Sequence, residues 1–154
     1  MVKYIHHMDR QPTEALDAVL HLSMLVNADL AGFEKASGLT GPRIHLLWIL
    51  GSTGPATQRA LATALEVTPR NVTGLVDGLV ASGHVTREPH PTDRRATLVT
   101  PTATGRRAID DLQASHTDLA QQLFGDVSPR RLSTFLSVLN ETTATFQRLM
   151  EEEQ

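Results

Sequence analysis

Residues 57–100 read TQRALATALEVTPRNVTGLVDGLVASGHVTREPHPTDRRATLVT, and this stretch decides the fold. It opens with two runs whose apolar residues recur at helix spacing, and Thr57 and Thr68 stand where N-terminal capping residues are expected. Pro69 suits a first helical turn, and Gly83 suits the left-handed residue that follows a helix. Because a turn of only about three residues separates the runs, the pattern predicts a helix-turn-helix.

Two strand-like segments follow, HVTRE (84–88) and ATLVT (96–100), and side-chain polarity alternates along both. The connection between them, PHPTDRR, holds two prolines and therefore predicts an extended hairpin tip. Arg94 at that tip could enter a DNA minor groove, where negative potential is concentrated. Asp93 is expected to hydrogen-bond Arg95 and stiffen the tip. A helix-turn-helix followed by a basic hairpin is a winged helix.

Helices are also predicted on both sides of this core. The expected fold class is mainly α with a small antiparallel β-hairpin, organised as a winged-helix core over 42–100 with flanking dimerisation helices over 13–36 and 101–150. Thr13 is the expected N-cap of the first helix, and Thr100 with Pro101 is expected to cap the helix after the hairpin. Apolar spacing in the flanking helices favours a homodimer.

The outer face of the second helix in the pair carries small and polar residues: Arg70, Asn71, Thr73, Gly74, Asp77, Gly78 and Ala81. Each interior glycine costs roughly 1 kcal/mol relative to alanine, so a close approach by another surface is expected. That surface could be DNA, since Arg can bind guanine, Asn adenine, and Thr a base or a phosphate. It could equally be a neighbouring helix.

Composition sets wider limits. The chain has 154 residues, of which 40% are hydrophobic and 20% charged, as expected for one soluble domain. The absence of cysteine excludes disulfides and thiolate metal sites. The net charge is −3, yet residues 57–107 hold seven Arg against four acidic side chains, a local charge of +3 that leaves −6 elsewhere. No signal peptide or membrane-spanning run is expected, and the cytoplasm is the expected location.

Metal, cofactor and enzyme chemistry find little support. His6 and His7 are adjacent, and the other five histidines lack the HxxxH or HxxE spacing of a helical metal site, so no metal or cofactor is expected. No GxSxG motif, glycine-rich phosphate loop or paired carboxylates are present. Ser82 and His84 form the one plausible nucleophile pair, without an orienting acid. The chain is therefore not expected to be an enzyme.

The order and spacing of these motifs resemble the MarR family of transcription regulators. The resemblance rests on Asp93-Arg94-Arg95, on LVTPTATG (98–105) and on VTGLVDGLVASG (72–83). It implies a homodimer, with recognition helices in successive major grooves and wings in the minor grooves. Position 66 holds Glu where the family often has glycine. The residues assigned to DNA are Thr57, Thr68, Arg70, Asn71, Thr73, Gly74, Arg94 and Arg95, with an Asp93–Arg95 ion pair in the wing.

The same resemblance implies a small aromatic or phenolic ligand that loosens DNA binding. Residues that could line its cleft are His21, Met24, Arg43, His45 and Trp48, although Met24 and Trp48 could equally be core residues and Arg43 solvated. The expected function is therefore a homodimeric, sequence-specific regulator of double-stranded DNA, a repressor relieved by ligand on a pseudo-palindromic operator. The alternative is a winged-helix module that recruits proteins and does not bind DNA.

Overall fold

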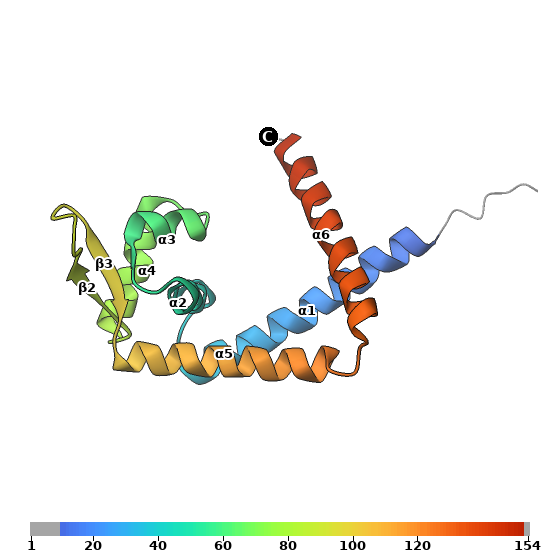
Figure 1. Cartoon of the computed structure of the whole chain (residues 1–154), viewed down its shortest axis with the longest axis horizontal. Helices are drawn as coiled ribbons and strands as arrows, with labels where there is room; N and C mark the ends of the chain where they lie inside the picture. The colour runs from blue at the N-terminus through green and yellow to red at the C-terminus, as the bar shows by residue number, and fades with distance from the viewer. Residues whose placement is uncertain (1–9, 153–154) are drawn as a thin grey trace, which may run out of the picture. The chain divides into compact units, whose positions relative to one another are not determined.

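The computed structural model describes residues 10–152 and confirms a mostly helical fold with a small antiparallel sheet (Figure 1). The chain divides into two compact units, Met1–Ile109 and Asp110–Gln154. The elements in chain order are α1 (Gln11–Ser37), α2 (Gly41–Thr53), β1 (Ala56–Thr57), α3 (Gln58–Ala64), α4 (Pro69–Ala81), β2 (Val85–Pro89), β3 (Thr97–Pro101), α5 (Ala103–Phe124) and α6 (Pro129–Glu152).

The core of the first unit is a single apolar cluster. Its fully buried side chains come from α2, α3, α4 and the sheet: Leu46, Leu47, Leu50, Leu61, Val72, Val76, Leu79, Val85 and Val99. Leu65 at the end of α3 is only half-buried, and Val80 near the end of α4 is exposed. The helix-turn-helix is thus anchored through α2 and the sheet.

The two predicted N-caps of the helix-turn-helix are confirmed. The Thr57 hydroxyl accepts a hydrogen bond from the Ala60 amide at 3.2 Å, and the Thr68 hydroxyl accepts one from the Asn71 amide at 3.2 Å. Pro69 follows in the first turn of α4. Each cap satisfies an amide that has no partner within its helix.

Helices α3 and α4 end in the same way, although their sequences differ at the deciding position. After α3, the Glu66 amide donates to the Thr63 carbonyl (3.2 Å) and the Val67 amide to the Ala62 carbonyl (3.0 Å), the Schellman arrangement. This requires a left-handed residue, and Glu66 has a φ of 55°. Gly83 fills the equivalent position after α4 with a φ of 76°. The turn therefore keeps its shape without the expected glycine, at a cost in strain.

The sheet has three strands in the order β1-β3-β2, one more than the hairpin predicted from the sequence. β2 and β3 pair antiparallel, with Arg87 opposite Val99 and Pro89 opposite Thr97. β1 adds two residues to the other edge of β3, with Ala56 opposite Val99. Residues just before α3 are thereby tied to the wing.

Helix α5 begins at Ala103, two residues later than predicted, because Pro101 still belongs to β3. The cap is Thr102, whose hydroxyl accepts from the Gly105 amide (3.1 Å) and donates to the Gly83 carbonyl (2.6 Å). A Cβ at Gly105 would collide with the backbone carbonyl of His84. The start of α5 is therefore held closely against the turn that follows α4.

Helix α1, in contrast, begins earlier than expected, at Gln11. Arg10 is its N-cap position, without a side-chain capping bond, and Pro12 lies in the first turn, so the predicted capping role of Thr13 is wrong. Large hydrophobic residues along α1 are exposed in the single chain: Leu16, Val19, Leu20, Leu22, Met24, Leu25, Val26 and Leu30. By length and composition alone α1 could cross a membrane, so the prediction that no run could do so is too strong.

The second unit contains the greater part of α5 together with α6. Phe124 and Phe135 pack near the turn between these helices, with ring centroids 6.0 Å apart. Further along, α6 exposes a row of large hydrophobic side chains: Leu136, Val138, Phe146, Leu149 and Met150. Such surface within one chain is typical of an interaction face.

Candidate nucleic-acid interface

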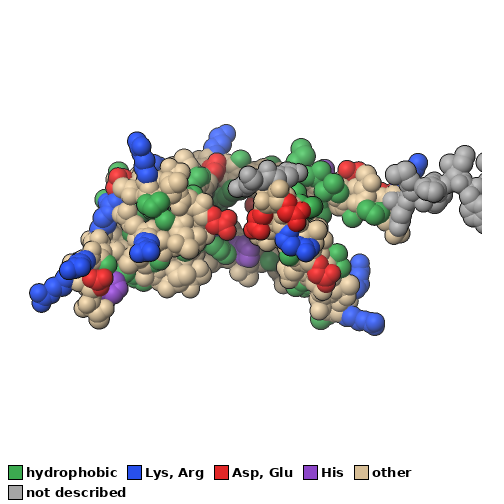
Figure 2. Space-filling view, turned by 90° about the horizontal axis from the view of Figure 1, so that it is seen from above, with side chains coloured by type: hydrophobic (Ala, Val, Ile, Leu, Met, Phe, Trp, Pro, Cys, Tyr) green, Lys and Arg blue, Asp and Glu red, His purple; other side chains and the backbone are tan. Residues whose placement is uncertain are grey.

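The first unit presents several exposed arginines whose guanidinium groups make no hydrogen bond or ion pair with any residue in the range 10–152. They are Arg59 on α3, Arg70 on α4, and Arg94 and Arg95 at the tip of the wing. Space filling shows Lys and Arg side chains projecting at the end of this unit that carries the wing (Figure 2). Arginines without internal partners keep all their donors for an external anion.

The wing tip is held by local hydrogen bonds from two side chains. Nδ1 of His90 accepts from the amides of Thr92 (3.3 Å) and Asp93 (3.1 Å). The Asp93 carboxylate accepts from the backbone amide of Arg95 at 2.9 Å. The tip is therefore shaped by acceptors that bind its own backbone.

The predicted ion pair between Asp93 and Arg95 is not formed within residues 10–152. A short aspartate side chain reaches the amide two residues on more readily than the end of a long guanidinium. The expected stiffening is present, through the backbone. Its consequence is that the Arg95 guanidinium stays available beside Arg94.

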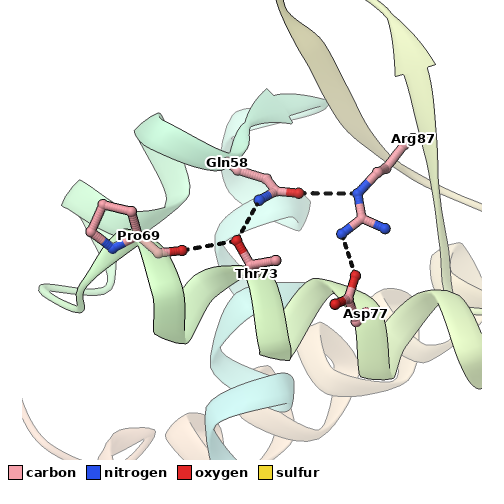
Figure 3. Close-up of polar contacts among 5 residues, drawn as sticks. All are labelled: Gln58, Pro69, Thr73, Asp77 and Arg87. Carbon is pink, nitrogen blue, oxygen red and sulfur yellow. Dashed lines mark hydrogen bonds and ion pairs between the residues drawn. The ribbon is translucent and has the colours of Figure 1, made fainter.

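Four side chains from α3, α4 and β2 form a continuous polar network (Figure 3). Arg87 on β2 donates through Nη2 to the Asp77 carboxylate (2.5 Å) and through Nε to Oε1 of Gln58 (3.0 Å). Nε2 of Gln58 donates to the Thr73 hydroxyl (3.0 Å), which in turn donates to the Pro69 carbonyl (2.9 Å). The network joins the wing to both helices of the helix-turn-helix.

The Arg87–Asp77 pair neutralises the acidic group on the outer face of α4. Its two side chains are 31% and 61% exposed, so the pair itself contributes at most about 1 kcal/mol to stability. Its greater effect is electrostatic, because it removes an unpaired negative charge from a face that carries Arg70 and Asn71. Gln58 and Arg87 could not be predicted as site residues from the sequence, since 29 positions separate them.

The two glycines of α4 have different surroundings. A Cβ at Gly74 would meet no atom within 4 Å, whereas one at Gly78 would fall on the guanidinium of Arg43 from α2. The explanation by a neighbouring helix therefore applies at Gly78, and the explanation by DNA stays a prediction at Gly74. Gly78 admits a neighbouring helix, and Gly74 leaves the exposed face open.

The predicted ligand residues are distributed over α1 and α2. His21 and Met24 are exposed on α1, His45 is exposed on α2, and Arg43 and Trp48 are half-buried there. The ligand set stays a prediction. Among residues 10–152 no group of three or more metal-ligating side chains is found, and His6 and His7 lie outside the described residues.

Comparison with known proteins identifies the family. The MarR family model matches residues 39–97. The HTH-type transcriptional regulator YcgE of Bacillus subtilis, itself uncharacterized, is 30% identical over 119 residues, which cover 77% of this chain and 75% of YcgE. The chain belongs to the MarR family and is a transcription regulator of that family.

Solved structures agree with this assignment. RV1404 from Mycobacterium tuberculosis has a TM-score of 0.67 and 28% identity, covering 86% of this chain and 93% of RV1404. FabT from Streptococcus pneumoniae, solved in complex with DNA, has a TM-score of 0.74 at 16% identity, covering 91% of this chain and 98% of FabT. The likeness to FabT shows a shared fold.

The relatives are transcription regulators, and none of these comparisons indicates an enzyme family. The one nucleophile pair in the sequence has a local structural role. The Ser82 hydroxyl lies 2.8 Å from Nδ1 of His84 and 3.3 Å from the Leu79 carbonyl, at the end of α4. Within the described range, no carboxylate hydrogen-bonds His84 to orient it.

Proposed function

We propose that the protein binds double-stranded DNA with sequence preference through α4 and the wing. The observation that carries the proposal is a set of four arginines with unpaired guanidinium groups: Arg59, Arg70, Arg94 and Arg95. In the same unit, Arg87 neutralises Asp77, the acidic residue on the outer face of α4. Phosphate binding by such arginines provides affinity, and base contacts provide preference. FabT, which shares the fold, was solved with DNA, and this supports the proposal.

Within this proposal, α4 lies in the major groove. Arg70 and Asn71 are exposed in its first turn, where they can reach guanine and adenine edges. The open face at Gly74 lets the helix backbone approach the groove closely. Arg94 and Arg95 extend from the wing toward an adjacent minor groove.

The active form is a homodimer. Large hydrophobic side chains are exposed along both α1 and α6, and a second copy of the chain would cover them. That occupant also accounts for the apolar character of α1 without a membrane. Two recognition helices about 34 Å apart would read a pseudo-palindromic operator. The organisation into a central DNA-binding core and terminal dimerisation helices belongs to the same proposal.

The regulator acts in the cytoplasm as a repressor. A dimer bound across a promoter excludes other proteins from the DNA it covers, which is the simplest way for such a fold to regulate. A small aromatic or phenolic ligand near Arg43, His45 and Trp48 would relieve it. Arg43 supports this part of the proposal, because its guanidinium lies against α4 at Gly78 and links α2 to the recognition helix.

Two arginine variants test the DNA proposal. Arg94→Ala should weaken binding to all duplexes, because a charge in the minor groove reads shape and potential. Arg70→Ala should relax preference at one base pair per half-site, by about 1–3 kcal/mol. Arg130→Ala on α6 is the matched control and should bind as the parent does. Parental affinity for both test variants in an anisotropy titration would refute the interface.

The dimer has its own test. Val138 is 58% exposed on α6, so Val138→Glu should cost one folded chain little. At a dimer interface the buried charge would be costly, and light scattering should show a monomer. Ala144→Glu is the control, because Ala144 is exposed on the face of the same helix that points away from the hydrophobic row. A parent chain that is monomeric at micromolar concentration would refute the dimer.

A further inference from the structure

Arg87 fixes the direction of both hydrogen bonds that Gln58 makes in this network (Figure 3). Arginine has donors only, so Nε of Arg87 must donate and the atom of Gln58 that faces it must be the carbonyl oxygen. The amide nitrogen of Gln58 then faces Thr73 and donates to its hydroxyl. The wing residue Arg87 thus determines which way the Gln58 amide points.

This order decides what the Thr73 hydroxyl can offer to a ligand. A hydroxyl has one proton and two lone pairs. Its proton is donated to the Pro69 carbonyl at 2.9 Å, and one lone pair accepts from Gln58 at 3.0 Å. One lone pair remains, so Thr73 can accept one more hydrogen bond and can donate none.

We propose that Thr73 is a specificity-determining residue that accepts a hydrogen bond from an amino group on a base edge, and that Gln58 and Arg87 are the positioning residues that impose this polarity. The inference rests on the proposed placement of α4 in the major groove. The amino groups there are N6 of adenine and N4 of cytosine, whereas guanine, thymine and phosphate present only acceptors to this hydroxyl. Thr73 therefore selects adenine or cytosine and does not hydrogen-bond the backbone of DNA.

The network also explains why a threonine hydroxyl can discriminate at all. A freely rotating hydroxyl serves as donor or acceptor and so tolerates every base. With its proton and one lone pair engaged, the Thr73 hydroxyl presents a fixed acceptor. Removing Gln58 leaves the bond to the Pro69 carbonyl as the one constraint on this hydroxyl within residues 10–152, so the proton can rotate toward a base acceptor at the cost of that single bond.

The test begins with selection of duplexes from a random library by the parent protein, which tests the proposed function by itself. In the selected half-site, each adenine is then replaced by 2′-deoxynebularine, which lacks the N6 amino group, and each cytosine by the pyrimidinone that lacks N4. At one position the parent should lose about three- to tenfold in affinity, the effect of one neutral hydrogen bond. Thr73→Val should show no loss there, and Thr73→Ser should restore it.

Thr63→Val is the matched control. The Thr63 hydroxyl on α3 donates to the carbonyl of Arg59, one turn back, at 3.2 Å, as the Thr73 hydroxyl does to Pro69. Within residues 10–152 it takes no part in the Gln58 network. This variant should keep the parent's sensitivity to the missing amino group. Gln58→Met should lower the discrimination at the Thr73 position, measured as the ratio of affinities for the natural and the amino-free duplex, and a simple loss of stability would not change that ratio.

Two results would overturn the inference. The first is an equal loss with the amino-free analogue for the parent and Thr73→Val, because the amino group would then be read by another residue. The second is a Gln58→Met variant with the parent's full discrimination at that position. If the library yields no preferred sequence at all, the proposed function fails at the selection step, before any analogue is used.

Discussion

Glu66→Gly should stabilise the protein, because Glu66 occupies a left-handed position that glycine adopts freely. The φ of 55° costs a non-glycine residue about 1–2 kcal/mol. Glycine also gives the unfolded chain more conformational freedom, and this offsets roughly 0.4–1 kcal/mol of the gain. The Glu66 side chain makes no hydrogen bond or ion pair within residues 10–152, so the substitution removes no bond. The net gain is about 0.5–1 kcal/mol, or roughly 1–4 °C in Tm.

The assay is urea denaturation at one fixed protein concentration, since the proposed dimerisation would make stability concentration-dependent. Glu66→Ala is the first control, because it removes the charge and keeps the strain, and it should leave stability near the parent's. Gly83→Ala is the second, because it introduces the same strain into the equivalent turn after α4, where a Cβ has open space. It should destabilise by a similar amount. Equal stability of Glu66→Gly and Glu66→Ala would refute the strain argument.

The remaining predictions concern α4 and the wing. Gly74→Ala should raise the free energy of unfolding by up to about 1 kcal/mol through helix propensity, and it should weaken DNA binding in an anisotropy titration. Gly78→Ala should displace Arg43 and therefore gain little stability in a thermal melt. A Gly74→Ala variant less stable than the parent would contradict this. His90→Leu removes the acceptor for two tip amides and should weaken DNA binding a few-fold, while His90→Asn, whose oxygen can replace Nδ1, should largely preserve it. Equal affinity of the two His90 variants would count against the wing geometry.

Much of the DNA-binding core was predictable because its signals are local. The caps at Thr57 and Thr68 and the left-handed Gly83 follow from side-chain chemistry within a few residues, and the structure confirms all three. The hairpin followed from alternating polarity. β1 was not predictable, because two residues are too few to show any period.

The polar network could not be read from the sequence, for a different reason. Gln58 and Arg87 meet only because β2 packs beside α3 and α4 in the folded unit, and nothing in the local pattern of either residue signals it. The Asp93–Arg95 prediction had the right residues and the wrong atoms, since opposite charges suggested an ion pair and the backbone amide was nearer. Arg43 was assigned to a ligand cleft, and its place against Gly78 depends on how α2 crosses α4.

The most direct test of the central claim is the salt dependence of binding by the parent protein to its selected duplex and to a shuffled one. In the proposed dimer, four arginines per chain with unpaired guanidinium groups would give up to eight phosphate or groove contacts, which predicts a slope of log K against log salt of about −5 to −7. Preference for the selected duplex should persist across the series. A shallow slope with equal affinity for both duplexes would contradict DNA binding through α4 and the wing, and would favour a protein-recruiting module.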